Sequence, residues 1–401
     1  MANLRKLGTL SAVILAALTL AACGSEESGP SSSSTSSGSG GAGGGGGAGG
    51  DESCALLAGQ LQAALDQSLA VEARAGGTAA AVITPDCGLW EGTAGEANAG
   101  VPLEPTHLLR IGSVTKTYVA ATVLKLVAGG SLSLDDTLDN WVTGVPNGDT
   151  ITVRQLLNHT AGVYSYTEDT AYMNGVAANP DTPVEPQDMV DVAINHGADF
   201  PPGTSWSYSN TGYILLGMII EAVVAGSVGP EIRSQVLDPQ GLEATFLDGE
   251  EPLGGELAHG FDAIGIDATN TLHPSVPWTA GSMVATAGDA ARWMTALYGG
   301  DVLEPAEQSA MLEAEDLGSG MEYGLGTFIL SPPASPWPAQ GHTGGIPGFL
   351  TNAFYFPDHD TAIATVVNSQ AGDPAAALAA LAMQVLPLPR RIIPARPPAA
   401  R

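Results

Sequence analysis

The chain is poor in basic residues. Its 401 residues include 13 lysines and arginines against 42 aspartates and glutamates, for a formal net charge of −29 at pH 7. Such a charge repels polyanions, so the composition argues against nucleic acid or an anionic membrane surface as a partner. Lysine is the scarcest basic residue, and after residue 22 only Lys116 and Lys125 remain. A lysine kept in such a chain is a candidate for a specific task.

Long apolar runs are also scarce. The one extended run, Leu7–Leu20, follows two basic residues, which is typical of a bacterial export signal. It ends in Leu-Ala-Ala-Cys, which resembles a lipobox, so we expect residues 1–22 to be a lipoprotein signal peptide and Cys23 to be lipidated. An ordinary cleavage site with an incidental cysteine is the alternative. No later run reaches transmembrane length. We therefore expect an exported protein of the cell envelope that touches the membrane only through the Cys23 lipid.

Only two further cysteines are present, Cys54 and Cys87. In an oxidising compartment such a pair can form a disulfide, and two free buried thiols are the alternative. Residues 23–53 consist mostly of Gly and Ser, which cannot bury a core and predict a flexible tether. Residues 387–401 combine proline with arginine and predict a disordered basic tail. The ordered domain is therefore expected over residues 54–386.

Both ends of this domain carry strand pairs, whereas its middle mixes short helices with long loops. Periodicity and turn residues predict helices over 55–73, 114–128, 212–225 and 374–386, and strands over 78–84, 89–95, 348–356 and 361–368. We expect an α/β fold of the α+β type, with one antiparallel sheet flanked by the first and last helices and an inserted, mostly helical lobe. The sheet lobe would span about 54–128 and 335–386, and the helical lobe about 129–334.

Ser113 and Lys116 form a Ser-x-x-Lys pattern at the start of the predicted helix 114–128. Residues three apart on a helix share a face, so the amine would lie beside the hydroxyl. Serine is a weak nucleophile that needs a neighbouring base. Lysine can be that base when burial lowers its pKa. The pattern therefore predicts a nucleophilic serine, although alone it is weak.

Two further segments carry candidate chemistry. Tyr208-Ser209-Asn210 precedes an apolar helix, and a tyrosine there can take a proton if a nearby cation holds it as phenolate. Asn210 can bind a substrate amide, and helix capping is the alternative for this segment. Gly341–Gly345, with the sequence Gly-His-Thr-Gly-Gly, precedes the last hairpin. Its glycines let a substrate approach a strand-edge N–H, which with the Ser113 N–H would form an oxyanion hole; a tight turn is the alternative.

In this order, Ser-x-x-Lys, Tyr-x-Asn and His-Thr-Gly resemble the motifs of the penicillin-recognising serine hydrolases. The similarity is to the branch of class C β-lactamases, D-alanyl-D-alanine carboxypeptidases and related esterases. Leu156–Gly162, Ala280–Thr286 and Tyr323–Gly326 also resemble signatures of this branch. The resemblance covers residues 54–386. It implies the beta-lactamase/transpeptidase-like fold and a serine hydrolase that forms an acyl-enzyme without a cofactor or a metal.

Carried onto this sequence, the resemblance implies a role for each motif residue. Ser113 would be the acylated nucleophile, and Lys116 and Tyr208 would pass its proton to the leaving group. The remaining roles are substrate binding by Asn210, His342, Thr343 and Gly344, and an oxyanion hole made by the N–H groups of Ser113 and Gly345.

Two departures from the β-lactamases bear on the substrate. His342 stands where they have lysine, and residues 327–340 contain no arginine or lysine to hold a substrate carboxylate. We expect D-Ala-D-Ala carboxypeptidase-like activity on a peptidoglycan peptide or another small molecule. An esterase or amidase is the first alternative, then a β-lactamase, and a non-catalytic binding module is the outside option. We also expect the cationic form of His342 to bind an anionic substrate, so that this activity falls as pH rises through about 6.5.

Overall fold

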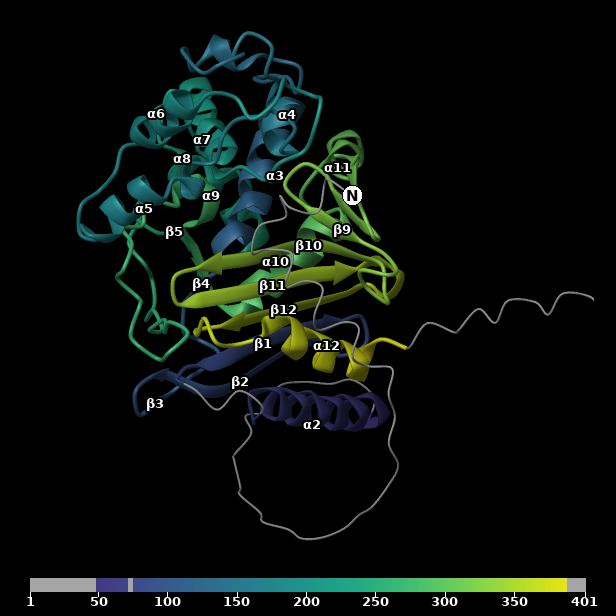
Figure 1. Ribbon diagram of the computed structural model, residues 1–401. Helices are drawn as coiled ribbons and strands as arrows, with labels where there is room; N and C mark the ends of the chain where they lie inside the picture. Colours follow the sequence, from purple (N-terminus) through teal and green to yellow (C-terminus); the bar gives the residue numbers. More distant parts are fainter. Residues whose placement is uncertain (1–47, 71–74, 388–401) are drawn as a thin grey trace, which may run out of the picture.

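The computed structural model describes residues 48–70 and 75–387 (Figure 1). The expected signal peptide, Cys23 and most of the expected tether and tail lie outside the described residues. The first helix, α2 (Ala48–Ala70), begins before the predicted domain boundary at residue 54. A helix that has been nucleated extends by one hydrogen bond per residue, which allows it to run back into a segment of low propensity. The predicted end of the tether at residue 53 is therefore wrong.

A nine-stranded antiparallel sheet forms the centre of the molecule, with the order β3-β2-β1-β12-β11-β10-β9-β8-β7. The strands are β1 (Gly77–Thr84), β2 (Gly88–Asn98), β3 (Val101–Pro102), β7 (Glu315–Gly318), β8 (Met321–Tyr323), β9 (Phe328–Leu330), β10 (Ala339–Ile346), β11 (Phe349–Phe356) and β12 (Thr361–Val367). Both predicted hairpins, β1–β2 and β11–β12, are present, and Thr78 of β1 pairs with Val367 of β12. The expected fold class, an antiparallel sheet flanked by helices, is confirmed.

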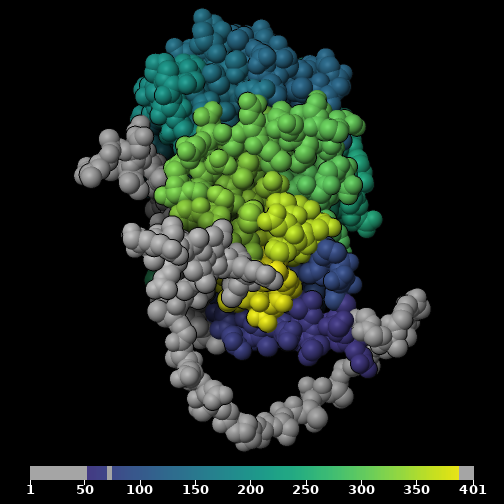
Figure 2. Space-filling view, turned by 90° about the vertical axis from the view of Figure 1, so that its right-hand side faces the viewer, coloured from purple at the N-terminus to yellow at the C-terminus, as the bar shows by residue number. Residues whose placement is uncertain are grey.

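Helices cover both faces of this sheet. Successive side chains of a strand point to opposite faces, and on β1 Ala80 and Val82 pack in one cluster with Leu61 of α2 and Leu381 of α12 (Pro374–Val385). Figure 2 shows α12, in yellow, beside α2, in purple. Ala79 and Ala81 belong to the cluster on the opposite face, where α10 (Ala287–Gly299) lies against β1, β11 and β12. The first and last helices thus share one face, and a helix from the middle of the chain covers the other.

The predicted division between the two lobes is wrong near residue 335. Strands β7, β8 and β9 come before this residue and belong to the sheet, and α10 packs on the sheet rather than in the helical lobe. These three strands are only three or four residues long. Alternation over so few residues gives almost no signal in a sequence.

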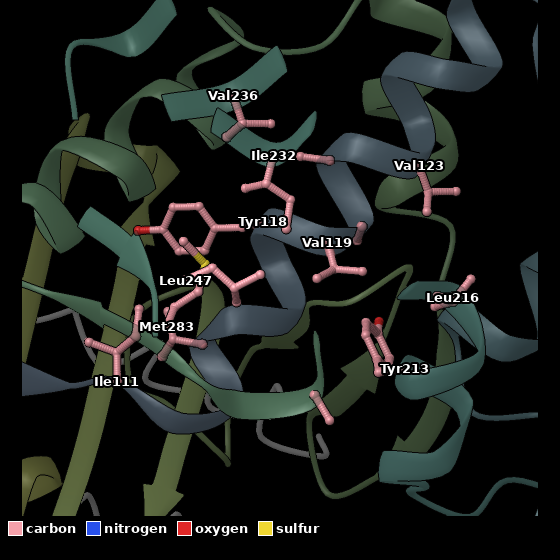
Figure 3. Packing of buried hydrophobic residues seen from close by; sticks show 14 of the residues in the cluster. Ile111, Tyr118, Val119, Val123, Tyr213, Leu216, Ile232, Val236, Leu247 and Met283 are labelled. Atoms are coloured by element: carbon pink, nitrogen blue, oxygen red, sulfur yellow. The ribbon is translucent and has the colours of Figure 1, made fainter. Parts of the chain in front are cut away.

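The helical lobe is built around α3 (Thr115–Ala128), which is buried on nearly every side. Val119 and Val123 of α3 lie on the side of Tyr213 and Leu216, whereas Tyr118 lies beside Leu247 and Met283 (Figure 3). The other elements here are α4 (Val153–Leu157), α5 (Thr170–Ala177), α6 (Pro186–His196), α7 (Asn210–Val224), α8 (Val228–Ile232), α9 (Trp278–Gly281), α11 (Pro305–Met311), and a small sheet of β4 (Leu109–Arg110), β6 (Met283–Ala285) and β5 (Thr245–Leu247). A helix buried all round needs apolar residues on every face, as α3 has.

No single helix within residues 48–70 and 75–387 has both the length and the apolar character needed to cross a membrane. By length and composition, α7 and the segment Val228–Gln240 meet that test only as a pair, and the pair is bent by 82°.

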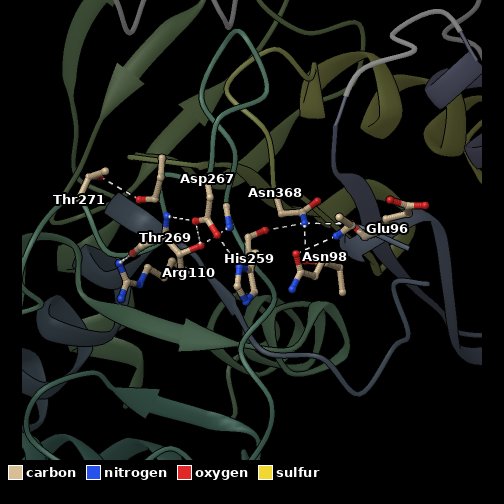
Figure 4. A network of polar contacts seen from close by, with 12 residues as sticks. Glu96, Asn98, Arg110, His259, Asp267, Thr269, Thr271 and Asn368 are labelled. Carbon is tan, nitrogen blue, oxygen red and sulfur yellow. Dashed lines mark hydrogen bonds and ion pairs between the residues drawn. The ribbon is translucent and has the colours of Figure 1, made fainter. Parts of the chain in front are cut away.

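The long loop between β5 and α9 is held in place by a chain of polar contacts (Figure 4). Arg110 of β4 donates to the carbonyl oxygen of Thr269 at 2.8 Å, and the Thr269 hydroxyl donates to Asp267 at 2.6 Å. Asp267 also contacts His259 Nδ1 at 2.6 Å, and Asn368, which follows β12, donates to the His259 carbonyl oxygen at 2.7 Å. Pairing avoids the cost of leaving polar groups unsatisfied. The loop is thereby tied to both the small and the large sheet.

Cys54 of α2 and Cys87, in the turn between β1 and β2, are joined in a disulfide that spans 33 residues of sequence. The disulfide connects the helix to the hairpin that it covers. Of the two alternatives that the sequence left open, the structure contains the bonded one.

Candidate active site

Ser113 lies in a single 3-10 turn, η1 (Gly112–Val114), which leads directly into α3. Gly112 has a φ of +53°, and a Cβ at this position would lie 2.7 Å from the backbone nitrogen of Gly345. On the other side of the same contact, a Cβ at Gly344 would overlap the carbonyl oxygen of Ile111. Only glycine suits this left-handed backbone and close approach. The turn and β10 therefore pack backbone to backbone, with the two proposed oxyanion donors, the N–H groups of Ser113 and Gly345, on segments in direct contact.

Lys116 is the second residue of α3, three residues after Ser113, and its amine is buried. Its Nζ is 3.1 Å from Ser113 Oγ, 2.8 Å from Asn210 Oδ1 and 2.6 Å from the carbonyl oxygen of Ala280. Burial lowers the pKa of Lys116 well below its usual range, because desolvation disfavours the ammonium form. A neutral amine has two N–H groups and one lone pair. The amide and carbonyl oxygens can only accept, so they take both N–H groups and leave the lone pair for the Ser113 proton.

Tyr208 packs beside this pair, with Lys116 Nζ 4.8 Å from the centroid of its ring. Burial raises the pKa of Tyr208 far above its usual value, and a contact with Ser113 only partly offsets the rise. The condition named for a phenolate, a nearby cation that holds it, is therefore not met, because desolvation favours the neutral phenol. Among the described residues the hydroxyl has no hydrogen bond of ordinary geometry, so its proton is available to a substrate.

Asn210 is the first residue of α7, two residues before the predicted start of that helix. Ser209 caps the helix by accepting from the Gly212 N–H at 3.4 Å, which was the structural alternative for this segment. Besides its contact with Lys116, the Asn210 side chain donates to Thr167 Oγ1 at 3.0 Å, and its backbone N–H donates to Ser165 Oγ at 3.1 Å. Neither hydroxyl was predicted from the sequence, because two hydroxyls in a polar loop carry no distinctive pattern.

His342 lies on β10, and its side chain is fully buried. Its Nε2 is 3.0 Å from the Tyr323 hydroxyl, and its Nδ1 contacts the Thr343 carbonyl oxygen. Burial, reinforced by nearby Lys116, lowers the pKa of His342 to about 3. The side chain is therefore neutral near pH 7, and the expectation that its cation binds an anionic substrate is wrong. The sequence could not show that residues from distant segments enclose this imidazole.

Thr343 points to the opposite face of the sheet from His342, because neighbouring strand residues alternate. It pairs with Asn352 of β11, and both line a small cavity with Phe354 and with Leu378 of α12. The Thr343 side chain therefore faces α12, and only the backbone of this residue remains for the predicted role in substrate binding. Gly344, by contrast, lies against the Ser113 turn as the motif implies.

The described residues contain no group of three or more His, Cys, Asp or Glu side chains arranged to hold a metal ion. The residues that meet around Ser113 supply an amine, a phenol, an amide and backbone groups. This set is suited to proton transfer and to nucleophilic attack on a carbonyl carbon.

Comparison with known proteins places this geometry in context. A sequence profile described as Beta-lactamase matches residues 60–386. Penicillin-binding protein 4* of Bacillus subtilis strain 168 is 28% identical over 289 residues, which are 67% of this chain and 62% of that protein. The chain thus matches about three-fifths of the length of this curated relative.

Two solved structures are similar over most of this chain. A D-stereospecific amidohydrolase from Streptomyces sp. is 30% identical with a TM-score of 0.72, over 80% of this chain and 97% of that one. The D-amino acid amidase from Ochrobactrum anthropi SV3, complexed with L-phenylalanine amide, is 25% identical with a TM-score of 0.74, over 82% of this chain and 98% of that one.

Proposed function

Since this chain belongs to the beta-lactamase family and is a serine hydrolase of that fold, we propose that it cleaves amides and esters whose leaving side carries no charge. The resemblance inferred from its three motifs is confirmed by the family match. The observation that carries the proposal is the full burial of His342 between the Tyr323 hydroxyl and the Thr343 carbonyl oxygen, because this enclosed imidazole presents no cation to a substrate carboxylate.

The other lysine and the arginines of the described residues are engaged elsewhere. Each arginine has an acidic partner, and Lys125 donates to the carbonyl oxygen of Val302 at 3.0 Å. The ion pairs are Arg110–Asp248, Arg154–Glu313, Arg233–Glu251 and Arg292–Asp289. Lys116 alone of them contacts Ser113, and its amine is committed to proton transfer. A carboxylate bound without a cation would forgo the charge-assisted hydrogen bonds that normally hold it.

The reaction follows from the contacts of Lys116. Its lone pair accepts the Ser113 proton as Oγ attacks the substrate carbonyl carbon, and the N–H groups of Ser113 and Gly345 receive the developing oxyanion. The neutral phenol of Tyr208 gives its proton to the leaving amine or alkoxide and regains one from the Lys116 ammonium. A water molecule then attacks the acyl carbon, Lys116 takes its proton, and Lys116 passes that proton to Ser113 Oγ as the bond between Oγ and the acyl carbon breaks. Protons balance over the cycle, because water supplies the hydrogen that the leaving group carries away.

The solved relatives support one substrate class for the first tests. Their names specify a D-stereospecific amidohydrolase and a D-amino acid amidase. We therefore propose D-amino acid amides and the corresponding esters as substrates of this chain.

D-Ala-D-Ala carboxypeptidase-like activity is the second candidate, and the similarity to penicillin-binding protein 4* favours it. Such a reaction requires a bound terminal carboxylate, for which the described site offers hydroxyl and amide groups, because its one amine, Lys116, is committed to proton transfer. The matched test uses one D-Ala-D-Ala peptide with a free or an amidated C-terminus.

We expect wild-type kcat/KM to be higher on the amidated peptide by about tenfold or more, the worth of one charge-assisted hydrogen bond. Ser113→Ala should hydrolyse neither peptide. A preference for the free carboxylate would establish the carboxypeptidase instead. Absence of both hydrolysis and fluorophosphonate labelling in the wild type would overturn the serine hydrolase mechanism.

We also propose that the protein is exported and anchored in the cell envelope through lipidated Cys23, where small molecules or peptidoglycan peptides would reach it. The lipobox-like sequence supports this proposal. Detergent partitioning of the wild type and of Cys23→Ala tests it. Equal partitioning of both proteins into the aqueous phase would contradict it.

A further inference from the structure

Tyr323, at the end of β8, connects two buried histidines behind the catalytic residues. Its hydroxyl oxygen lies 3.2 Å from His159 Nε2 and 3.0 Å from His342 Nε2, and all three side chains are buried. His159 comes from the loop after α4, and His342 comes from β10. The three residues therefore join segments that are far apart in sequence.

The hydrogen bonds that link His159, Tyr323 and His342 have only one consistent donor-to-acceptor direction. His159 Nδ1 accepts from the Ser209 backbone N–H at 3.2 Å, so the proton of the neutral ring must sit on Nε2. That N–H donates to the Tyr323 oxygen, and the Tyr323 hydroxyl donates to His342 Nε2. His342 then carries its proton on Nδ1 and donates it to the Thr343 carbonyl oxygen. A proton added to His342 Nε2 would leave the Tyr323 hydroxyl without an acceptor.

His159 also holds both residues that flank Tyr208. Its carbonyl oxygen accepts from the Ser207 N–H at 3.1 Å, and its ring accepts from the Ser209 N–H. Its ring centroid lies 4.2 Å from that of Tyr208. His159 has a φ of +65°, a left-handed conformation that is uncommon for a residue other than glycine. The position of this one residue therefore sets the position of Tyr208.

We propose that His159, Tyr323 and His342 form a relay of positioning residues, named here the His–Tyr–His relay, which aligns Tyr208 with Ser113 and keeps both imidazoles uncharged beside Lys116. The inference rests on the proposed function, in which Tyr208 passes a proton to the leaving group. The relay ties the Tyr208 segment to β10, the strand that carries Gly345. A charged imidazole would repel the Lys116 ammonium that forms during attack and would weaken that base.

The titratable side chains that face the relay are all identified in the described structure. Lys116 influences both imidazoles, the rings of Tyr208 and Tyr213 pack on His159, and Tyr208, Tyr213 and Tyr298 act electrostatically on Tyr323. Burial raises the pKa of all three tyrosines, so they stay neutral on the acid side of the pH profile. No carboxylate contributes to the lowered pKa of either histidine. A change in the pH profile after disruption of the relay can therefore be assigned to the imidazoles or to Lys116.

Tyr323→Phe removes the hydroxyl from both hydrogen bonds and keeps the ring, which packs edge-on against Phe328 at 4.7 Å. Tyr298→Phe is the matched control, since this buried hydroxyl bonds to Thr327 Oγ1 at 2.7 Å outside the relay. We expect Tyr323→Phe to lower kcat about tenfold or more with little change in KM, and to move the acid limb of the pH profile to higher pH. Tyr298→Phe should leave both readouts unchanged.

Nitrogen-15 spectra of the histidines provide a readout that does not depend on activity. We expect two neutral imidazoles of opposite tautomer at pH 7, with the proton on Nε2 in His159 and on Nδ1 in His342. A charged ring or the reverse tautomers would overturn the relay. If the wild type labels at Ser113 but Tyr323→Phe and Tyr298→Phe have the same kinetics, the relay would also be overturned. Failure of the wild type itself to label would instead refute the proposed function.

Discussion

One added methyl group at Gly344 tests the proposed oxyanion hole. A Cβ there would overlap the Ile111 carbonyl oxygen and would lie 3.3 Å from the Ser113 backbone nitrogen. Both neighbours are backbone atoms, so they cannot rotate aside, and β10 must move away from the Ser113 turn. A displacement of about 1 Å can cost about 10²-fold in rate, and loss of one oxyanion donor costs about 10²–10³-fold. We expect Gly344→Ala to lower kcat by about 10²-fold, with overpacking that destabilises the fold by about 1–3 kcal/mol.

Stopped-flow acylation with a chromogenic ester measures this rate, and thermal melting separates a slow enzyme from an unfolded one. Gly175→Ala is the control, because a Cβ on this α5 residue would meet no atom within 4 Å. If Gly344→Ala melts as a folded protein and acylates within about threefold of the wild type, then contact between β10 and the turn does not position the oxyanion donors.

Three further predictions follow from the same structure. Lys116→Ala and Tyr208→Phe should each slow acylation by about 10²-fold or more. Because both residues move the same proton, the double variant should be little slower than either single variant. Additive losses in log rate would contradict this. Activity should fall as pH drops through the pKa of Lys116, because only the neutral amine accepts the Ser113 proton, and burial lowers this pKa. A pH profile that is flat on the acid side would exclude Lys116 as the base. Removing the disulfide by Cys54→Ser and Cys87→Ser should lower the free energy of unfolding by about 3–4 kcal/mol, given its 33-residue span; an unchanged denaturation midpoint would show that the crosslink does not restrain the unfolded chain.

Local patterns were enough to predict the parts of the structure that depend on neighbouring residues. The contact between Lys116 and Ser113 followed from helical spacing, and the two hairpins followed from strand-forming runs of seven or more residues on either side of turn residues. The outer strands β7, β8 and β9 escaped prediction because each is too short to show a period.

The charge states of the site residues depend on tertiary contacts, which local sequence patterns do not predict. His342 is neutral because Tyr323 and the loop of His159 enclose it, and neither is near it in sequence. Tyr208 remains a phenol because it is buried, and burial likewise favours the neutral amine of Lys116 beside its ring, so the cation that a phenolate requires is missing. Motif spacing therefore located the reacting groups, and only the three-dimensional packing determined which of them carry charge.

The pairing of β1 with β12 also sets an order of events in folding. Thr78 aligns with Val367, so two central strands of the sheet come from opposite ends of the described chain. Closing so long a loop costs chain entropy before any contact between the strands compensates for it. During synthesis, β1 and β2 would emerge long before β12 and α12. The apolar faces of β1 and β2 would remain exposed to solvent until then. A chain that stops short of β12 should therefore yield no smaller folded domain, because the middle of the sheet is completed last.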